Sequence, residues 1–166
     1  MDSATITPEE FVYSAKQFCD ISEKLCDGWI FCKDEEKHKC YIKKEAYISH
    51  EGENTSTLLK AVFIIFYNLS YGVPSFSFNI WNSSGVLLTL EEIRTMSFIV
   101  IKKEDFYSVI TQQEHPVLSR PYFIMHPCHT ATLLSTLKSQ SKNIIVTFLS
   151  LITPLLRLEL PLEYGL

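Results

Sequence analysis

The chain has 166 residues, of which 46% are hydrophobic and 20% are charged, and its formal net charge is −4. This composition excludes a disordered chain, and the length suits one domain, 1–166, around a single core. The acidic balance argues against a broadly basic surface, so we expect no nucleic acid among the partners.

The first predicted element is a helix that starts at the TPEE motif. Thr7 can cap it, Pro8 suits the first helical position, and Glu10 completes a capping box. Apolar residues then recur at helical spacing along one face, at Phe11, Ala15, Phe18 and Leu25. The sequence therefore predicts an amphipathic helix that packs one face inward and ends near Asp27 and Gly28.

Four strands are predicted next, in the first half of the chain. Two short ones lie near Trp29 and over 39–48, and residues 50–57 are predicted to be a loop. The apolar run AVFIIFYNLSY (61–71) and the run SFSFNIWN (75–82) are predicted to form a hairpin at the middle of an antiparallel sheet. The second run alternates between an apolar face and a polar face, the latter made of Ser75, Ser77 and Asn79.

The second half of the chain is less regular. Thr89 opens a short helix with a second capping box, and Pro121–Met125 is predicted to be a short strand. Thr130 or Thr132 can cap the helix that follows. The last predicted helix, at 144–156, is an apolar segment of thirteen residues. Because this segment is too short to span a bilayer, we expect a buried helix and no stable membrane insertion.

The chain has five cysteines, and their spacing does not indicate a metal site. Cys26, Cys32 and Cys40 with His38 form the nearest approach to a zinc cluster, but their gaps do not fit the usual Cys-x₂₋₄-Cys pair. The first ten residues lack the basic and apolar segments of a secretory signal. We therefore expect free thiols in a reducing, cytoplasmic location, with no metal and no other cofactor.

Cys128 directly follows His126 and Pro127, where the predicted strand gives way to a helix. The backbone N–H groups and the dipole at a helix N-terminus favour a thiolate there. Spacing alone leaves three interpretations open. A thiol hydrolase would take its base from His126 or His129, although such a base normally comes from a distant element. A thioester carrier needs only an exposed cysteine, an oxyanion donor and partner surfaces, and the third interpretation is a semi-buried structural cysteine.

Four segments carry a resemblance to a known family. They are TQQEHPVL at 111–118, PYFIMHPC at 121–128, LPLEY at 160–164 and YGVPSFSFNIWNSSGVLLTLEEI at 71–93. These segments resemble the autophagy ubiquitin-conjugating-enzyme-like family, and the similarity is densest from residue 105 onward. The resemblance implies an α+β fold with a ubiquitin-conjugating-enzyme-like core, in which a four-stranded antiparallel sheet is accompanied by an N-terminal helix and C-terminal helices.

The resemblance also implies an activity, the transfer of a ubiquitin-like modifier. An activating enzyme, autophagy-related protein seven, would pass the modifier, autophagy-related protein twelve, to Cys128 as a thioester. The modifier would then move to a lysine of autophagy-related protein five without a separate ligase. Two alternatives are a catalytically inactive binding module of the same fold and the sister family that conjugates a lipid headgroup. The sister family carries a long disordered insertion that this sequence lacks.

The sequence departs from ordinary ubiquitin-conjugating enzymes at one point. Those enzymes carry His-Pro-Asn before the cysteine, and the Asn side chain is assigned to oxyanion stabilisation. Here the two His-Pro pairs are followed by Val117 and by Cys128 itself. An oxyanion donor must lie about 3 Å from the developing charge. The candidates, by proximity or by their place on the central hairpin, are His126, Tyr71 and Tyr67.

The segment Thr111–Pro116 is polar, ends at a proline and has no apolar period. It is predicted to be either a solvated loop or a segment that shapes the catalytic groove or contacts a partner. The central hairpin is predicted to have an exposed edge. That edge would either accept an added strand from a partner or be guarded by polar side chains.

Overall fold

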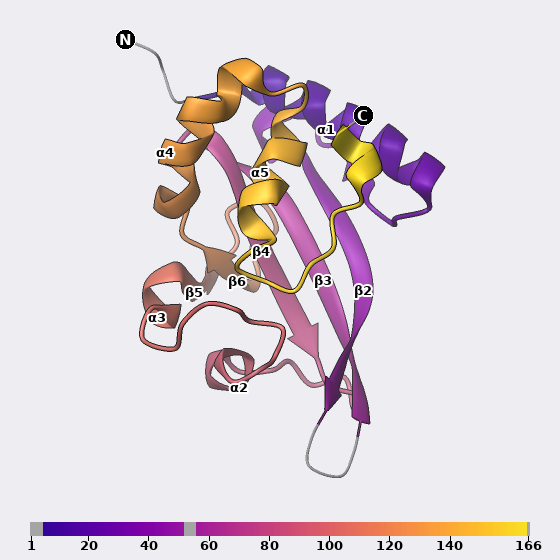
Figure 1. Ribbon diagram of the computed structural model, residues 1–166, viewed down its shortest axis with the longest axis vertical. Coiled ribbons are helices and arrows are strands. Elements are labelled where there is room, and N and C mark those ends of the chain that lie inside the picture. The colour runs from indigo at the N-terminus through magenta and orange to yellow at the C-terminus, as the bar shows by residue number, and fades with distance from the viewer. Residues whose placement is uncertain (1–4, 52–55, 166) are drawn as a thin grey trace.

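The sheet at the centre of the fold has six antiparallel strands (Figure 1). In this computed structural model, which describes residues 5–51 and 56–165, the strand order is β1-β2-β3-β4-β6-β5. The middle of the loop predicted at 50–57 lies outside the described residues. The strands are β1 (Ile30–Cys32), β2 (Tyr41–Glu51), β3 (Ser56–Asn68), β4 (Val73–Trp81), β5 (Ile110–Glu114) and β6 (Pro121–Met125).

Helices α1 and α5 pack side by side across one face of the sheet (Figure 1). The core between them and the sheet is rich in phenylalanine, with Phe11, Phe63, Phe78 and Phe148 at most 1% exposed. The α+β class, the N-terminal helix and the antiparallel sheet are therefore confirmed. The α-helices are α1 (Pro8–Leu25), α2 (Leu90–Arg94), α3 (Phe106–Val109), α4 (Cys128–Leu137) and α5 (Ile144–Ile152).

The ends of α1 follow from local chemistry. The Thr7 hydroxyl accepts the Glu10 backbone N–H at 3.1 Å, as the TPEE motif predicts. At the other end the helix stops at Leu25, because Cys26 takes the left-handed conformation with φ of 54°. The predicted end near Asp27 and Gly28 is thus two residues late.

The prediction of four strands is wrong, because β5 and β6 extend the sheet to six. β6 coincides with the strand predicted at Pro121–Met125, whereas β5 occupies the polar segment that was predicted to be irregular. β5 is an edge strand whose residues from Thr111 to Glu114 are all exposed, so its sequence needs no apolar alternation. The predicted free edge of the central hairpin is also wrong, because β2 flanks β3 and β6 flanks β4.

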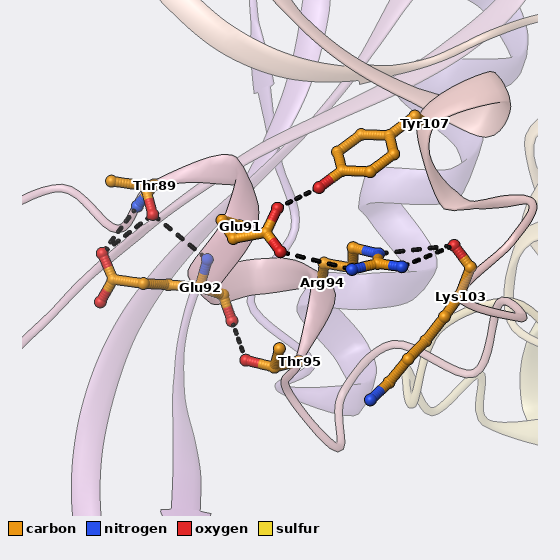
Figure 2. A network of polar contacts seen from close by, with 7 residues as sticks. All are labelled: Thr89, Glu91, Glu92, Arg94, Thr95, Lys103 and Tyr107. Carbon is orange, nitrogen blue, oxygen red and sulfur yellow. Dashed lines mark hydrogen bonds and ion pairs between the residues drawn. The ribbon is translucent and has the colours of Figure 1, made fainter.

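A network of polar contacts joins α2 to α3 (Figure 2). The predicted capping box at Thr89 is present, with Glu92 as its partner. Glu91 accepts a hydrogen bond from the Tyr107 hydroxyl and forms an ion pair with Arg94 at 3.3 Å. The Arg94 guanidinium lies 5.2 Å from the centre of the Tyr107 ring and donates to the Lys103 carbonyl. These contacts hold α3 in place beside the end of β6.

The helix predicted after Cys128 starts earlier than expected. It begins at Cys128 itself, with Pro127 as the N-cap residue, and neither Thr130 nor Thr132 caps it. The Thr130 hydroxyl instead donates back to the Pro127 carbonyl at 3.3 Å. The last helix, α5, ends at Ile152 rather than residue 156. Within the described residues, no helix is both long and apolar enough to cross a membrane.

The polar face of β4 is covered by His115, which is only 1% exposed. The His115 Nδ1 atom accepts the backbone N–H groups of Val117 and Leu118 at 3.1 and 3.2 Å. The proton of the neutral ring therefore sits on Nε2, which donates to the Ser77 hydroxyl at 3.1 Å. Ser77 in turn donates to the Ile64 carbonyl at 3.3 Å. The segment Thr111–Pro116, for which a solvated loop was one of the two predictions, is thus anchored to the sheet by a buried histidine.

Acid is expected to weaken the fold through His115. Burial lowers the pKa of His115 from 6.5 to about 4. Below about pH 6.5 the unfolded chain binds a proton at His115, whereas the folded protein binds it only near pH 4. The contribution of the neutral His115 to the free energy of unfolding is therefore complete above pH 6.5 and is lost as the pH falls towards 4. We expect a loss of about 2 kcal/mol in the free energy of unfolding.

Urea unfolding followed by tryptophan fluorescence, at a series of pH values from about 7 to 4.5, measures this loss. The control is His115→Gln, which keeps an amide that can hydrogen-bond but has no ionisable ring. The difference between the two proteins isolates His115 from the carboxylates that titrate in the same range. Parallel pH curves would contradict the assignment.

Candidate functional site

Cys128 is an exposed free thiol at the first residue of α4. Its backbone N–H donates to the His126 Nδ1 atom at 3.2 Å. The backbone N–H of His126 donates to the Val109 carbonyl at 2.7 Å, which ties the loop before the cysteine to the end of α3. The thiol therefore stands at the N-terminus of α4, on a loop that is held from two sides.

The contact with Cys128 sets the tautomer of His126. Because Nδ1 accepts a backbone N–H, the proton of the neutral ring sits on Nε2. The side chain of His126 is exposed, like that of Cys128. The residue that contacts the cysteine backbone thus carries a ring N–H, the kind of group that an oxyanion donor needs.

Tyr71 reaches His126 from the turn between β3 and β4. The two rings meet edge to face, with their centres 5.8 Å apart and an angle of 78° between their planes. The turn holds Tyr71 through Asn68, whose side-chain oxygen accepts the Tyr71 backbone N–H at 3.1 Å. Asn68 was not among the predicted site residues, although an asparagine shortly before a glycine is a common turn signal.

Tyr67 has a different environment from the other predicted site residues, Cys128, His126 and Tyr71. Its ring is 6% exposed and lies 6.0 Å from that of Phe11, inside the main core. Its hydroxyl donates to the Ile6 carbonyl at 2.7 Å, and burial raises its pKa. The structure therefore gathers Cys128, His126 and Tyr71 in one place, whereas the Tyr67 hydroxyl fastens the chain before α1 to the sheet.

Gly72 closes the turn that carries Tyr71. Its φ is 66°, and a Cβ atom added there would lie 2.8 Å from the side chain of Thr5. Its carbonyl accepts the Ile6 N–H at 2.7 Å, so the segment before α1 passes directly over this glycine. Both the backbone conformation and the close approach therefore require glycine at this position.

Gly72→Ala is expected to lower the free energy of unfolding by about 2 to 4 kcal/mol, because strain and overpacking act together. The matched control is Gly85→Ala. Gly85 also has a positive φ, of 77°, but nothing lies within 4 Å of its added Cβ, so about 1 kcal/mol is expected there. Urea unfolding of both variants measures the difference. Equal losses would show that the contact with Thr5 contributes nothing.

A groove of about 420 Å³ adjoins the site, and we call it the β5 groove. It is lined by the β3–β4 turn, by β5 and β6, and by the two residues before Cys128. Its lining residues are Phe66, Asn68, Leu69, Ser70, Tyr71, Thr111, Gln113, Pro116, Ile124, His126 and Pro127. Half of the polar segment Thr111–Pro116 therefore shapes a groove next to the candidate cysteine.

The other cysteines are less suited to chemistry. Burial raises the pKa of Cys19 to about 12, and Cys40 is 2% exposed. Cys26 is an exposed free thiol, but it lies at the C-terminal cap of α1, away from the segments that carry the family resemblance. Across the described residues, no group of three His, Cys, Asp or Glu side chains is arranged to hold a metal ion.

Comparison with known proteins shows which family the chain belongs to. The profile of the family described as "Autophagocytosis associated protein, active-site domain" matches residues 9–163. The human ubiquitin-like-conjugating enzyme ATG10 is 35% identical over 119 residues, which are 66% of this chain and 54% of that protein. Its namesake from Arabidopsis thaliana is 32% identical over 113 residues, 61% of this chain and 50% of that protein. The chain thus aligns with about half the length of these relatives.

Proposed function

Because the chain belongs to the family of autophagocytosis associated proteins with this active-site domain, we propose that it is a ubiquitin-like-conjugating enzyme of autophagy. It carries its modifier as a thioester on Cys128. The fold described above, with an N-terminal helix and an antiparallel sheet beside the cysteine, serves as a ubiquitin-conjugating-enzyme-like core. Its place of action is the cytoplasm, where free thiols persist.

The observation that carries the proposal is the setting of Cys128. The thiol is exposed at a helix N-terminus, beside a histidine whose residue also lines the β5 groove. A hydrolase would need an enclosed site with a base oriented by a third group. A carrier needs access for two large partners in turn, and an exposed thiol supplies it.

The first step is an exchange of thioesters. The Cys128 sulfur, as a thiolate, attacks the carbonyl carbon of the modifier's C-terminal glycine, which arrives bound to the cysteine of the activating enzyme. A tetrahedral oxyanion forms and collapses, and the activating enzyme's sulfur leaves and takes up a proton. The two thioesters have nearly equal free energies, so the equilibrium constant of the exchange is close to one. The rate of the step therefore depends on its activation barrier.

The second step forms the isopeptide bond. The neutral amine of a target lysine attacks the same carbonyl carbon, the bond to the Cys128 sulfur breaks, and the amine loses a proton. In both steps the oxyanion develops beside the cysteine, where the Nε2–H of His126 donates to it. Tyr71 keeps the His126 ring in position through the contact between their rings. The Tyr67 hydroxyl, which donates to Ile6, takes no part in this scheme.

We propose the partners that the family resemblance implies. The modifier is autophagy-related protein twelve, the activating enzyme is autophagy-related protein seven, and the target is autophagy-related protein five. The human relative is named as a ubiquitin-like-conjugating enzyme, which supports the chemistry but does not name these partners.

Reconstitution with two competing acceptors tests this function. The protein is mixed with the activating enzyme, the modifier and ATP, then with either the target protein or vesicles that carry phosphatidylethanolamine. We expect a thiol-resistant conjugate with the target and none with the lipid. Conjugation of the lipid would instead indicate the sister activity. If the protein binds the modifier without transferring it to either acceptor, it is a binding module.

A further inference from the structure

A second pocket, which we call the strap pocket, lies between the helix-covered face of the sheet and residues 157–161. These residues follow α5 and lead the chain back across the sheet towards α1 (Figure 1). The volume of the strap pocket is about 260 Å³. Since a cavity of about 150 Å³ holds one benzene ring, this pocket has room for a ligand of roughly ten non-hydrogen atoms. Among the described residues, it shares no lining residue with the β5 groove.

The floor of the strap pocket is apolar. Trp29, Phe63 and Phe98 line it, and they are 6%, 1% and 3% exposed. Ala46 lines it from β2 with only a methyl group, which leaves the space above the floor open. This floor therefore suits an aliphatic or aromatic body that is removed from water on binding.

An ion pair forms part of the wall. The Lys44 Nζ atom donates to Asp27 Oδ1 at 2.9 Å, and the Tyr164 hydroxyl donates to Asp27 Oδ2 at 2.6 Å, so both carboxylate oxygens are engaged. An ammonium group has three N–H donors, and among the described residues Asp27 is the one side chain that accepts from Lys44. The Lys44 side chain is only 20% exposed. It therefore has donors left for a further acceptor in the pocket.

Two exposed charges of opposite sign, Arg157 and Glu159, complete the lining. Within the part of the chain that the structure describes, neither side chain takes part in an ion pair or a hydrogen bond. The two charges offset each other, and the carboxylate of Asp27 is already satisfied. The remaining donors of Lys44 therefore decide which charge the pocket prefers.

We propose that the strap pocket binds a small amphipathic monocarboxylate. Its carboxylate accepts from Lys44 and Arg157, and its apolar body lies on the floor at Trp29 and Phe98. A cation is disfavoured there, because it would stand next to the Lys44 ammonium. A neutral ligand of the same shape gains the floor but forms only weaker hydrogen bonds. This inference is independent of the proposed function, since it involves neither Cys128 nor the transfer of a modifier.

Three probes with the same eight-carbon chain test the chemistry of the ligand: octanoate, octanol and octylamine. Isothermal titration calorimetry of the full chain near neutral pH measures each dissociation constant. We expect a Kd on the order of 0.3 mM for octanoate, and binding at least about tenfold weaker for the other two. Equal affinities for the three probes would indicate nonspecific apolar binding and would overturn the proposal. Tighter binding of octylamine, or no binding of octanoate, would also overturn it.

Three variants locate the site. Arg157→Gln should weaken octanoate binding about two- to fivefold, and Glu159→Gln should strengthen it by a similar factor, because exposed charges have modest effects. Both positions are exposed, so neither change threatens the fold. Ala46→Leu fills the space above the floor and should abolish binding, and circular dichroism checks that this variant is folded. If Ala46→Leu does not fold, the opposite effects of the two charge variants decide.

A folded Ala46→Leu variant that binds octanoate with unchanged affinity would place the ligand elsewhere. Changes of the same sign in Arg157→Gln and Glu159→Gln, or no change in either, would show that the carboxylate does not lie beside these residues. Each of these results would overturn the assignment of the strap pocket.

Discussion

Conjugation of the target by a Cys128→Ala variant is expected to fall to background, about 10³-fold or more below the unmodified protein. The reason is that alanine lacks the sulfur atom on which the thioester with the modifier forms. The fold should survive, because Cys128 is exposed and alanine is a good helix former at the start of α4. The measurement is the initial rate of conjugate formation with activating enzyme, modifier, ATP and target.

The control for Cys128→Ala is Cys26→Ala, which removes another exposed free thiol. Cys26 lies at the end of α1, in the left-handed conformation, so its replacement costs some stability at most. Its conjugation rate should stay within about twofold of the unmodified protein. Loss of conjugation in Cys26→Ala with retention in Cys128→Ala would assign the thioester to Cys26, at the C-terminal end of α1, and contradict the assignment of Cys128.

The second large effect is expected for His126→Ala. Removing one oxyanion donor typically costs about 10² to 10³ in rate. The loss should appear in both transfer steps, while the rate of alkylation of Cys128 by iodoacetamide should change little. That contrast separates an oxyanion donor from a residue that merely shapes the loop, because a distorted loop would change alkylation as well.

Tyr71→Phe is the matched variant for His126→Ala. It keeps the ring that contacts His126 and removes only the hydroxyl. If His126 donates to the oxyanion, Tyr71→Phe should retain most of the transfer rate. If instead Tyr71→Phe loses 10²-fold or more and His126→Ala does not, the Tyr71 hydroxyl is the donor and the assignment of His126 is wrong.

Local patterns predicted those elements whose signals lie close together in the sequence. The helix α1, the β3–β4 hairpin and the capping box at Thr89 all follow from residues that are close in sequence. β5 was missed because an exposed edge strand carries no apolar alternation, and only its pairing with β6 defines it. The start of α4 was missed because Pro127 opens the helix without a side-chain cap.

The residues of the candidate site also fall into those that local sequence predicts and those that depend on distant contacts. Cys128 and His126 could be predicted because they are neighbours in sequence, and the structure adds the hydrogen bond between them. The position of Tyr71 depends on a turn that is fixed by Gly72 and the distant Ile6, so sequence could not separate it from Tyr67. The burial of His115 also depends on a distant partner, Ser77, which is 38 residues away. Contacts of this kind have no local signature.

The central claim is that Cys128 carries the modifier as a thioester, and a trap of the intermediate tests it most directly. The protein is incubated with the activating enzyme, the modifier and ATP, and is then run on a non-reducing gel beside Cys128→Ser. We predict a thiol-sensitive adduct on the unmodified protein, and a thiol-resistant ester or no adduct on Cys128→Ser. A thiol-sensitive adduct on Cys128→Ser, or none on the unmodified protein with a competent activating enzyme, would contradict the account.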